Sequence, residues 1–406
     1  MTKEVDVVVI GAGPAGSVAS SKLIKEGLKV LVLEKMQFPR FVIGESLLPY
    51  SMGFLSELGL LPVVEALKFQ IKTGACFYHE GERCDFLFEN QFSEGWSYTY
   101  QVKRADFDHA LIKEVEKQGA EVAFQAEVTD VQTSPGKQVV TYRDGNGDVH
   151  AVQCRFVMDA SGYGRVLPQM FNLEVPVSTP HRGAVFAHID DRKRTPDAGR
   201  NIFVHAFNDN TAWIWSIPFS DGTASVGIVG NTDFVEECYA DGGKLFKKCV
   251  AEFPGLNGRY DGVEFMFEPR LIVNYAVSVK QVYGEGYVLC GNSTEFLDPI
   301  FSSGVTLAIF SGYKAAALVA KQLNGESVDW ENDYSEMLKK GIDVFRTYVQ
   351  AWYEGTLGDI FFSSRTDDQI RQQICSVLAG YVWDETNPFV KKHNTLVNAV
   401  AHIVKM

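Results

Sequence analysis

Short apolar runs separated by glycines mark the beginning of the chain. Residues 5–10 are a β-branched run that ends in glycines, and residues 15–26 have a helix-compatible pattern that stops at Gly27. Residues 28–34 form a second apolar run. Strand, helix and strand in this order predict a βαβ unit whose two strands lie parallel and buried.

Helical and strand-like patterns alternate through the middle of the chain. A helical pattern over residues 51–67 is broken at Gly59 and Pro62, and a later one at 104–118 ends at Gly119. The turn signal at 144–147 predicts a hairpin between two strand-like runs. The predicted strands are 73–77, 86–88, 98–102, 122–132, 138–143, 149–154, 156–162 and 287–292.

Residues 165–285 contain many short alternating segments, which predict a second, mostly antiparallel sheet. A helix over 305–323 and a helical C-terminal region follow. We therefore expect a mixed α/β protein: a Rossmann-like nucleotide domain, an interleaved antiparallel-sheet substrate domain and a C-terminal helical extension. The predicted division is 1–72, 101–165 and 285–325 for the first, 73–100 and 166–284 for the second, and 326–406 for the third.

Composition narrows the choice of partners. The 406 residues are 46% hydrophobic, and their net charge of −13 disfavours binding to nucleic acid, so a small-molecule partner is expected. Seven cysteines without a CxxC pair suit a reducing cytosol, and eight histidines without metal-like spacing predict no metal site. Without a leader pattern or a long uninterrupted apolar stretch, we expect a cytoplasmic protein with no transmembrane segment.

Three glycines connect the first strand to the first helix with GxGxxG spacing. Gly11 permits the tight turn, Gly13 lets the backbone approach a pyrophosphate, and Gly16 allows close packing of the helix. The positive end of the helix then faces the phosphates. Glu34 ends the next strand, where it can accept hydrogen bonds from ribose hydroxyls. This context predicts a dinucleotide site rather than a purely structural turn.

Arg104 before a helix and the Asp159-Ala160-Ser161-Gly162 turn after a strand have no specific meaning by themselves. In this order, however, residues 1–325 resemble a group of FAD enzymes that includes aromatic hydroxylases, geranylgeranyl reductases and flavin-dependent halogenases. The resemblance implies that Arg104 contacts the flavin nucleotide. It also implies a ribityl contact at Gly291 and Asn292, where Asn replaces the usual Asp but can still accept a hydrogen bond.

Two tryptophans lie two residues apart in a strand-like run. Trp213 and Trp215 should therefore project from one face of the strand, where both could simply be core residues. The W-x-W-x-I-P pattern resembles the halogenase signature, in which the tryptophans separate substrate from flavin, although reductases have a related Y-x-W-x-F-P pattern. The resemblance gives Trp213 and Trp215 a tunnel-wall role.

Lys72 starts a strand in an apolar neighbourhood, and by default it would be a surface lysine. Its place in the chain matches the catalytic lysine of halogenases. Burial of such an amine lowers its pKa, so the resemblance implies that Lys72 acts as a nucleophile toward hypohalous acid or as a hydrogen-bond donor to it.

The run at 298–305 precedes a helix, and its backbone amides could hold an anion. In other flavoenzymes the corresponding stretch contacts the flavin. Here the run resembles that of phenol- and pyrrole-type halogenases, which implies a halide at Ser303 and Gly304. Phe301 occupies the position at which tryptophan-type halogenases carry a glutamate. The substrate expected from this resemblance is an electron-rich phenol or pyrrole.

The resulting hypothesis is an FADH2-dependent halogenase that uses chloride or bromide. Neither of two further glycine-containing turns, at 162–164 and 284–286, opens a predicted helix after a strand, so a separate flavin reductase is expected to supply FADH2. An acyl or peptidyl carrier protein could hold the aromatic substrate. A geranylgeranyl-reductase-like dehydrogenase and an aromatic hydroxylase are the alternatives. The predicted cofactor contacts are Gly11, Gly13, Ala15, Gly16, Glu34, Lys35, Gly44, Glu45, Ser46, Arg104, Asp159, Gly291, Asn292, Pro299, Ser303, Gly304 and Val305.

Overall fold

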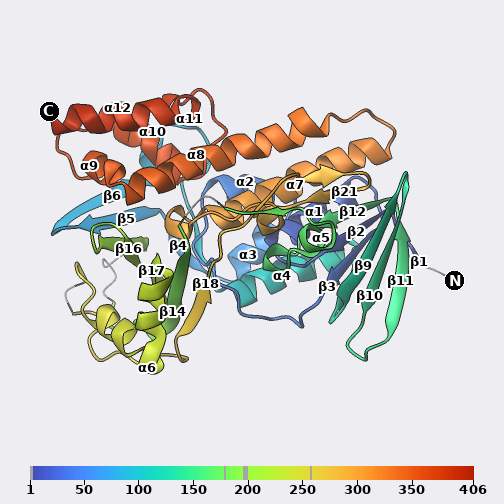
Figure 1. The fold of residues 1–406 in the computed structure, drawn as a ribbon, viewed down its shortest axis with the longest axis horizontal. Coiled ribbons are helices and arrows are strands. Elements are labelled where there is room, and N and C mark those ends of the chain that lie inside the picture. The colour runs from blue at the N-terminus through green and yellow to red at the C-terminus, as the bar shows by residue number, and fades with distance from the viewer. Residues whose placement is uncertain (1–2, 178–179, 195–199, 257) are drawn as a thin grey trace.

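The structure is a computed structural model that describes residues 3–177, 180–194, 200–256 and 258–406. A Rossmann-like sheet with its helices lies at the centre of the molecule (Figure 1). A small sheet flanks it near the N-terminus, a larger sheet lies on the other side, and the C-terminal helices form a layer along the top of this view. The mixed α/β architecture expected from the sequence is confirmed.

The central sheet has six strands. α1 (Pro14–Lys25) connects two neighbouring strands, which pair in parallel with Val7 opposite Val30, so the predicted βαβ unit is confirmed. α7 (Ser303–Leu323) packs against α1, where a Cβ at Gly312 would stand 2.4 Å from the Ala15 carbonyl oxygen. In spatial order the strands are β20 (Tyr283–Gly284), β21 (Tyr287–Leu289), β12 (Phe156–Asp159), β2 (Val7–Ile10), β3 (Val30–Glu34) and β8 (Glu121–Phe124).

A four-stranded sheet packs beside the Rossmann-like sheet through a separate apolar cluster. The predicted hairpin is present, but the strand expected over 122–132 is wrong. Gln125 adopts a left-handed backbone conformation with φ 53°, which separates β8 from the next strand. The four strands are β1 (Lys3–Glu4), β11 (Val149–Cys154), β10 (Lys137–Arg143) and β9 (Glu127–Ser134).

The seven-stranded sheet is antiparallel except where β15 pairs in parallel with β5. The sequence predicted only short strands in this region and did not predict α6 (Thr232–Ala251). Residues 240–243 depart from helical backbone angles and interrupt the helical periodicity of α6. In spatial order the strands are β18 (Arg270–Val273), β14 (Arg182–Asp190), β17 (Thr223–Asn231), β16 (Ala212–Pro218), β15 (Ile202–Phe207), β5 (Gly74–His79) and β6 (Glu82–Leu87).

Further elements join these sheets. The break predicted at Gly59 and Pro62 is confirmed, since α2 (Tyr50–Glu57) and α3 (Leu61–Ala66) are separate helices. The glycines at 162–164 form a 3-10 turn before a short helix, which the sequence pattern did not predict. The remaining elements used below are α4 (Arg104–Gln118), β4 (Gln70–Lys72), β7 (Thr99–Gln101), α8 (Glu336–Tyr353) and α9 (Thr356–Phe361).

The C-terminal region is helical, as predicted. Among the described residues, α7 is the helix long and apolar enough to cross a membrane, but 72% of its most apolar window is buried inside the protein. It is therefore a core helix of this fold. The residue boundaries assigned to the three regions remain a prediction.

Candidate active site

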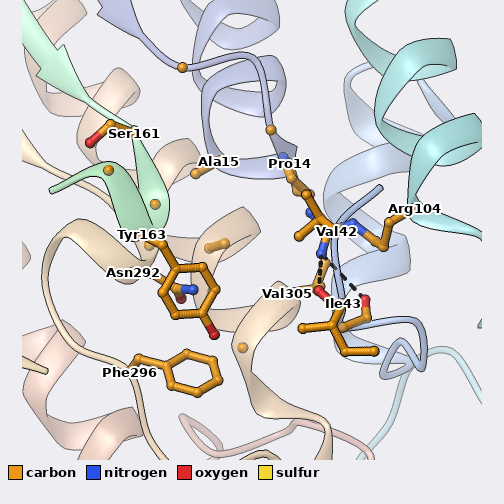
Figure 2. A pocket seen from close by; sticks show the side chains of 18 of the residues that line it. Pro14, Ala15, Val42, Ile43, Arg104, Ser161, Tyr163, Asn292, Phe296 and Val305 are labelled. Atoms are coloured by element: carbon orange, nitrogen blue, oxygen red, sulfur yellow. Dashed lines mark hydrogen bonds between the residues drawn. The ribbon is translucent and has the colours of Figure 1, made fainter. Parts of the chain in front are cut away.

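A cavity of about 650 Å³ opens between the Rossmann-like sheet and the seven-stranded sheet. The start of α1, the start of α7, the 42–46 loop and β16 all contribute to its walls. Figure 2 shows the side of this cavity where Pro14, Arg104 and Val305 approach one another, with Tyr163 and Phe296 opposite them. The cavity thus joins the predicted nucleotide motif to the predicted substrate sheet.

The glycines of the first turn have different roles. Gly11 has φ +98°, and a Cβ there would stand 2.5 Å from the Ala160 carbonyl oxygen. At Gly16 a Cβ would stand 2.0 Å from the Gly11 oxygen, so this glycine serves helix packing and is not part of the lining. Gly13 does line the cavity, and a Cβ there would meet only the Arg40 guanidinium, at 3.6 Å.

Glu34 ends β3, the place that the sequence predicts for it, and lies in the cavity wall. Its carboxylate accepts hydrogen bonds from the backbone amides of Ala12 at 2.9 Å and Met36 at 2.8 Å. These bonds fix the carboxylate beside the glycine turn, and each oxygen keeps a lone pair for a ribose hydroxyl. Ala15 and Lys35 also line the cavity.

Arg104 is buried and lines the cavity at the first turn of α4. Its guanidinium makes two hydrogen bonds, of 2.8 and 2.9 Å, to the Asp108 carboxylate. The remaining amino group donates to the carbonyl oxygens of Ile43 at 3.2 Å and Gly44 at 3.4 Å (Figure 2). Arg104 therefore holds the 43–44 loop against the cavity, in addition to any contact with a bound nucleotide.

Asp159 is fully buried and does not line the cavity. It accepts hydrogen bonds from the backbone amides of Ser161 and Leu167 and from the Ser293 hydroxyl. Asp159 thereby positions the turn after β12 and the turn after β21. Those two turns do reach the cavity, through Ser161 and Asn292 among others.

Both predicted tryptophans line the cavity, and their ring centroids lie 5.7 Å apart. The Trp215 indole donates to Ser225 Oγ at 3.1 Å. The Trp213 indole donates to the Tyr353 hydroxyl at 2.9 Å, and Tyr353 in turn donates to Asp298 Oδ2 at 2.8 Å. Tyr353 belongs to α8, so the C-terminal region orients one of the two tryptophans.

Asp298 connects this network to the run at 298–305. Its Oδ2 also accepts from the Tyr275 hydroxyl at 3.0 Å, and burial raises the pKa of the Asp298 carboxyl above its ordinary value. The Arg182 guanidinium stacks on the Tyr353 ring, 3.4 Å from its centroid. Sequence reasoning missed Tyr275 and Tyr353, because no local pattern connects either of them to the tryptophans.

The start of α7, where the sequence predicts flavin and halide contacts, reaches the cavity. Ser302 adopts a left-handed conformation with φ 58° and lines the cavity, as do Pro299, Gly304 and Val305. The Ser303 side chain is buried and is not part of the lining. The backbone at the N-terminus of α7 therefore faces the cavity more directly than the side chain of Ser303 does.

Lys72 is buried, with 1% of its surface exposed, and it is not among the residues that line the cavity. Its ammonium donates to the Leu47 carbonyl oxygen at 2.8 Å and lies 5.6 Å from the Phe88 ring centroid. Burial lowers the pKa of Lys72 to about 7. Leu47 directly follows Gly44, Glu45 and Ser46, which do line the cavity, so the lysine is held against the loop that borders it.

Glu45 makes a contact that the sequence did not predict. Its Oε1 lies 2.7 Å from Nε2 of His188 on β14, while its Oε2 has no hydrogen-bond partner among the described residues. The loop is thus attached to the seven-stranded sheet as well as to Arg104. Because His188 lies 143 positions away along the chain, no local pattern could have identified it.

Comparison with known proteins assigns the chain to a family. Residues 4–333 match the FAD binding domain family. The chain is 30% identical to a 1H-pyrrole-2-carbonyl-(peptidyl-carrier protein) chlorinase of Pseudomonas fluorescens, over 93% of this chain and 89% of that protein. The chain belongs to the flavin-dependent halogenases.

Solved structures share this fold, and one of them is a flavin-dependent halogenase. A flavoprotein/dehydrogenase from Cytophaga hutchinsonii is 48% identical, with a TM-score of 0.97 over 100% of this chain and 99% of that one. A flavin-dependent brominase is 26% identical, with a TM-score of 0.85 over 99% and 100% of the two chains. This halogenase-family protein is therefore an FAD-dependent oxidoreductase, and FAD is its cofactor.

The residues of the cavity fit FAD. Gly13 leaves room for a pyrophosphate at the start of α1, whose N-terminus receives no capping hydrogen bond from a described side chain. Glu34 is positioned for a ribose, and the second wall, with Trp213 and Trp215, lies across the cavity on the other sheet. The individual contacts between these residues and FAD remain predictions.

Proposed function

We propose that this protein halogenates an electron-rich pyrrole or phenol that is presented on a carrier protein. FADH2, O2 and a halide would yield hypohalous acid, and the halogen would then replace a hydrogen on the aromatic ring. When bound, reduced FAD supplies the two electrons that reduce O2 to the peroxide level, and oxygen at that level can oxidise the halide. Residues of the chain would bind the hypohalous acid, keep the substrate away from the flavin and select the substrate.

The observation that carries this proposal is the buried Lys72 beside the loop that borders the cavity. A lysine with a pKa of about 7 exists in both protonation states near neutral pH. Its ammonium donates to Leu47, immediately after the loop residues that line the cavity. Such an amine can donate a hydrogen bond to hypohalous acid when charged, or attack it when neutral.

The two tryptophans support separation of the flavin from the substrate. Trp213 and Trp215 form one wall of the cavity, and hydrogen bonds to Tyr353 and Ser225 hold their indoles in place. Fixed rings fill space that a substrate would otherwise occupy beside the flavin. Hydroxylation, which requires direct contact between flavin and substrate, is then disfavoured.

The environment of Phe301 supports an activated aromatic ring as the substrate. Phe301 is buried among the rings of Phe77, Tyr348 and Trp352, with centroids 6.2–6.3 Å away. This position therefore offers no carboxylate to remove a ring proton. A pyrrole or phenol stabilises the cationic intermediate through its own heteroatom, so it depends less on such a base.

Similarity to the 1H-pyrrole-2-carbonyl-(peptidyl-carrier protein) chlorinase supports a carrier-bound substrate. We further propose that a separate flavin reductase delivers FADH2 and that the reaction takes place in the cytoplasm. A halide held by the backbone near Ser303 and Gly304, at the N-terminus of α7, would complete the site.

The test supplies the purified protein with FAD, a flavin reductase, NADH, O2 and bromide. Pyrrole-2-carboxylate on a carrier thioester, free pyrrole-2-carboxylate and a simple phenol are compared by mass spectrometry. We expect a brominated product, formed fastest on the carrier, and its loss in Lys72→Met. The nearby exposed Lys68→Met serves as the control and should keep activity.

Two results would contradict the proposal. One is hydroxylation of the ring, or reduction of an alkene without O2, in place of bromination. The other is equal bromination by Lys72→Met and the wild type, which would remove the lysine from the mechanism while leaving the FAD assignment intact.

A further inference from the structure

The loop that borders the cavity is part of a small sheet. Ser46 pairs with Gln101 in an antiparallel bridge. The Val102 backbone amide donates to the Glu45 carbonyl oxygen at 2.7 Å, and the Leu47 amide donates to the Tyr100 carbonyl oxygen at 3.1 Å. Because β7 also pairs with β4, residues 45–47 form the third strand of a ribbon.

Four polar side chains share one face of this ribbon. Directly paired residues of antiparallel strands project to the same side, and so do alternate residues of one strand. Ser46 is opposite Gln101, Thr99 lies two residues before Gln101, and Lys72 is opposite Thr99. We call Ser46, Lys72, Thr99 and Gln101 the polar face.

The polar face is buried, and most of its polar atoms lack hydrogen-bond partners among the described residues. Thr99 and Gln101 have no exposed surface, and Ser46 is 5% exposed. The Ser46 and Thr99 hydroxyls and both amide atoms of Gln101 have no hydrogen-bond partner among the described residues. Buried polar atoms without partners are rare in proteins and indicate bound water or a ligand. Here they share one face of the ribbon with the buried amine that the proposed function requires.

We propose that the polar face binds hypohalous acid, with Gln101 and Thr99 as contact residues beside Lys72. This inference rests on the proposed function and adds residues to it. Ser46 belongs both to the polar face and to the cavity lining, so the face adjoins the space where the oxidised halogen forms. A neutral oxyacid has one donor and several acceptor lone pairs, and it therefore suits a primary amide, which donates and accepts.

The reaction on this face is balanced. The halogen–carbon bond forms at the ring as the oxygen–halogen bond of hypohalous acid breaks. The departing oxygen takes up the ring proton and leaves as water. Donors from Gln101, Thr99 and Lys72 stabilise the negative charge that develops on this oxygen. The same contacts hold the acid inside the protein until the ring arrives.

The experiment compares the FAD-loaded wild type with Thr99→Val and Gln101→Leu, which keep side-chain size and remove the polar atoms. Ser20→Ala is the control, since the buried Ser20 hydroxyl on α1 has no hydrogen-bond partner within the described ranges. Brominated product is measured against hypobromous acid that escapes to a scavenger in solution. We expect the ratio of product to escaped acid to fall about five- to tenfold in both variants, the scale of losing one hydrogen bond. Ser20→Ala should match the wild type.

A second readout does not depend on catalysis. If the polar face is dry, Thr99→Val should raise the melting temperature, because it removes an unsatisfied group at no cost. That result, or an unchanged product ratio in both variants, would overturn the inference. An unchanged or lower melting temperature with a lower ratio supports it. If the wild type forms no hypobromous acid, the proposed function fails. Ordered solvent on the polar face in holoenzyme crystals would then test separately whether a polar site is present.

Discussion

At the scale of single residues, Lys72 is a lysine whose charge is disfavoured by its surroundings. Its hydrogen bond to the Leu47 oxygen only partly replaces water, and burial accounts for the fall of its pKa from 10.5 to about 7. A surface lysine would stay charged at every physiological pH. The protonation state of Lys72 therefore depends on the pH range in which the enzyme works.

This burial predicts a pH-dependent stability. Between pH 7 and about 10 the unfolded chain keeps the Lys72 proton and the folded chain releases it, so raising the pH favours folding. Relative to Lys72→Met, the wild type should gain up to about 1.4 kcal/mol of unfolding free energy per pH unit in this window. Urea unfolding at pH 7, 8 and 9 measures the difference. A pH-independent difference would mean that the folded protein keeps the proton. Lys68→Met retains Lys72 and should gain stability over Lys72→Met as the wild type does.

The Tyr353 hydroxyl gives a second prediction at this scale. Tyr353→Phe leaves the buried Trp213 indole without its acceptor and Asp298 without one donor, which should cost about 1–3 kcal/mol of stability. Tyr348→Phe is the matched control on the same helix, because the buried Tyr348 hydroxyl has no hydrogen-bond partner in the part of the chain that the structure describes. Urea unfolding measures the loss of stability, and tryptophan emission reports the change around the Trp213 indole. Equal behaviour of the two variants would exclude the proposed positioning of Trp213.

At the scale of elements, the wall of tryptophans depends on the pairing of β16 with β17. Trp215 is directly opposite Gly227, and the ring lies over the backbone of that glycine. A side chain at Gly227 would occupy the space that the indole fills. The strand pair thus determines both the face on which the ring projects and how closely it can pack.

Gly227→Ala tests this pairing. The added Cβ would stand 2.2 Å from the Trp215 ring, so the ring must move, and we expect a loss of about 1–3 kcal/mol together with a shift in tryptophan emission. Gly358→Ala is the control. Gly358 lies in α9, and a Cβ there would meet no described atom within 4 Å outside its own helix. That variant should gain about 0.5–1 kcal/mol through helix propensity. Unchanged emission in Gly227→Ala would mean that the ring is not held against this strand.

At the scale of the whole molecule, the cavity lies between two sheets whose strands are interleaved along the chain. A bound FAD would contact several of the elements that border this cavity. A ligand that binds only the folded state raises stability, by about 2.7 kcal/mol at a hundred times its dissociation constant. FAD should therefore raise the melting temperature of the wild type.

Gly13→Val should weaken FAD binding without destabilising the fold. Gly13 has ordinary backbone angles and room for a side chain, so the variant should fold with a melting temperature close to that of the wild type without FAD. It should lose most of the rise on adding FAD, because its side chain enters the space for the pyrophosphate. Differential scanning calorimetry with and without FAD measures both. An equal rise in both proteins would place the pyrophosphate elsewhere.

Features that depend on neighbouring residues could be predicted from the sequence. The βαβ unit, the glycine turn and the shared face of Trp213 and Trp215 follow from backbone periodicity and from the lack of a Cβ in glycine. Local signals failed where the backbone departs from its regular angles. Gln125 divides a predicted strand, and residues 240–243 interrupt the pattern of α6.

The sequence by itself determined the family, the cofactor and the segments that border the cavity, because each of these depends on short motifs of neighbouring residues. Only the tertiary structure decided which side chains meet. Glu45 contacts His188 and Trp213 contacts Tyr353 across about 140 positions, and Lys72 is buried against a loop 25 residues earlier. Such contacts come from the packing of sheets and helices that are distant in the chain, and no local pattern encodes them.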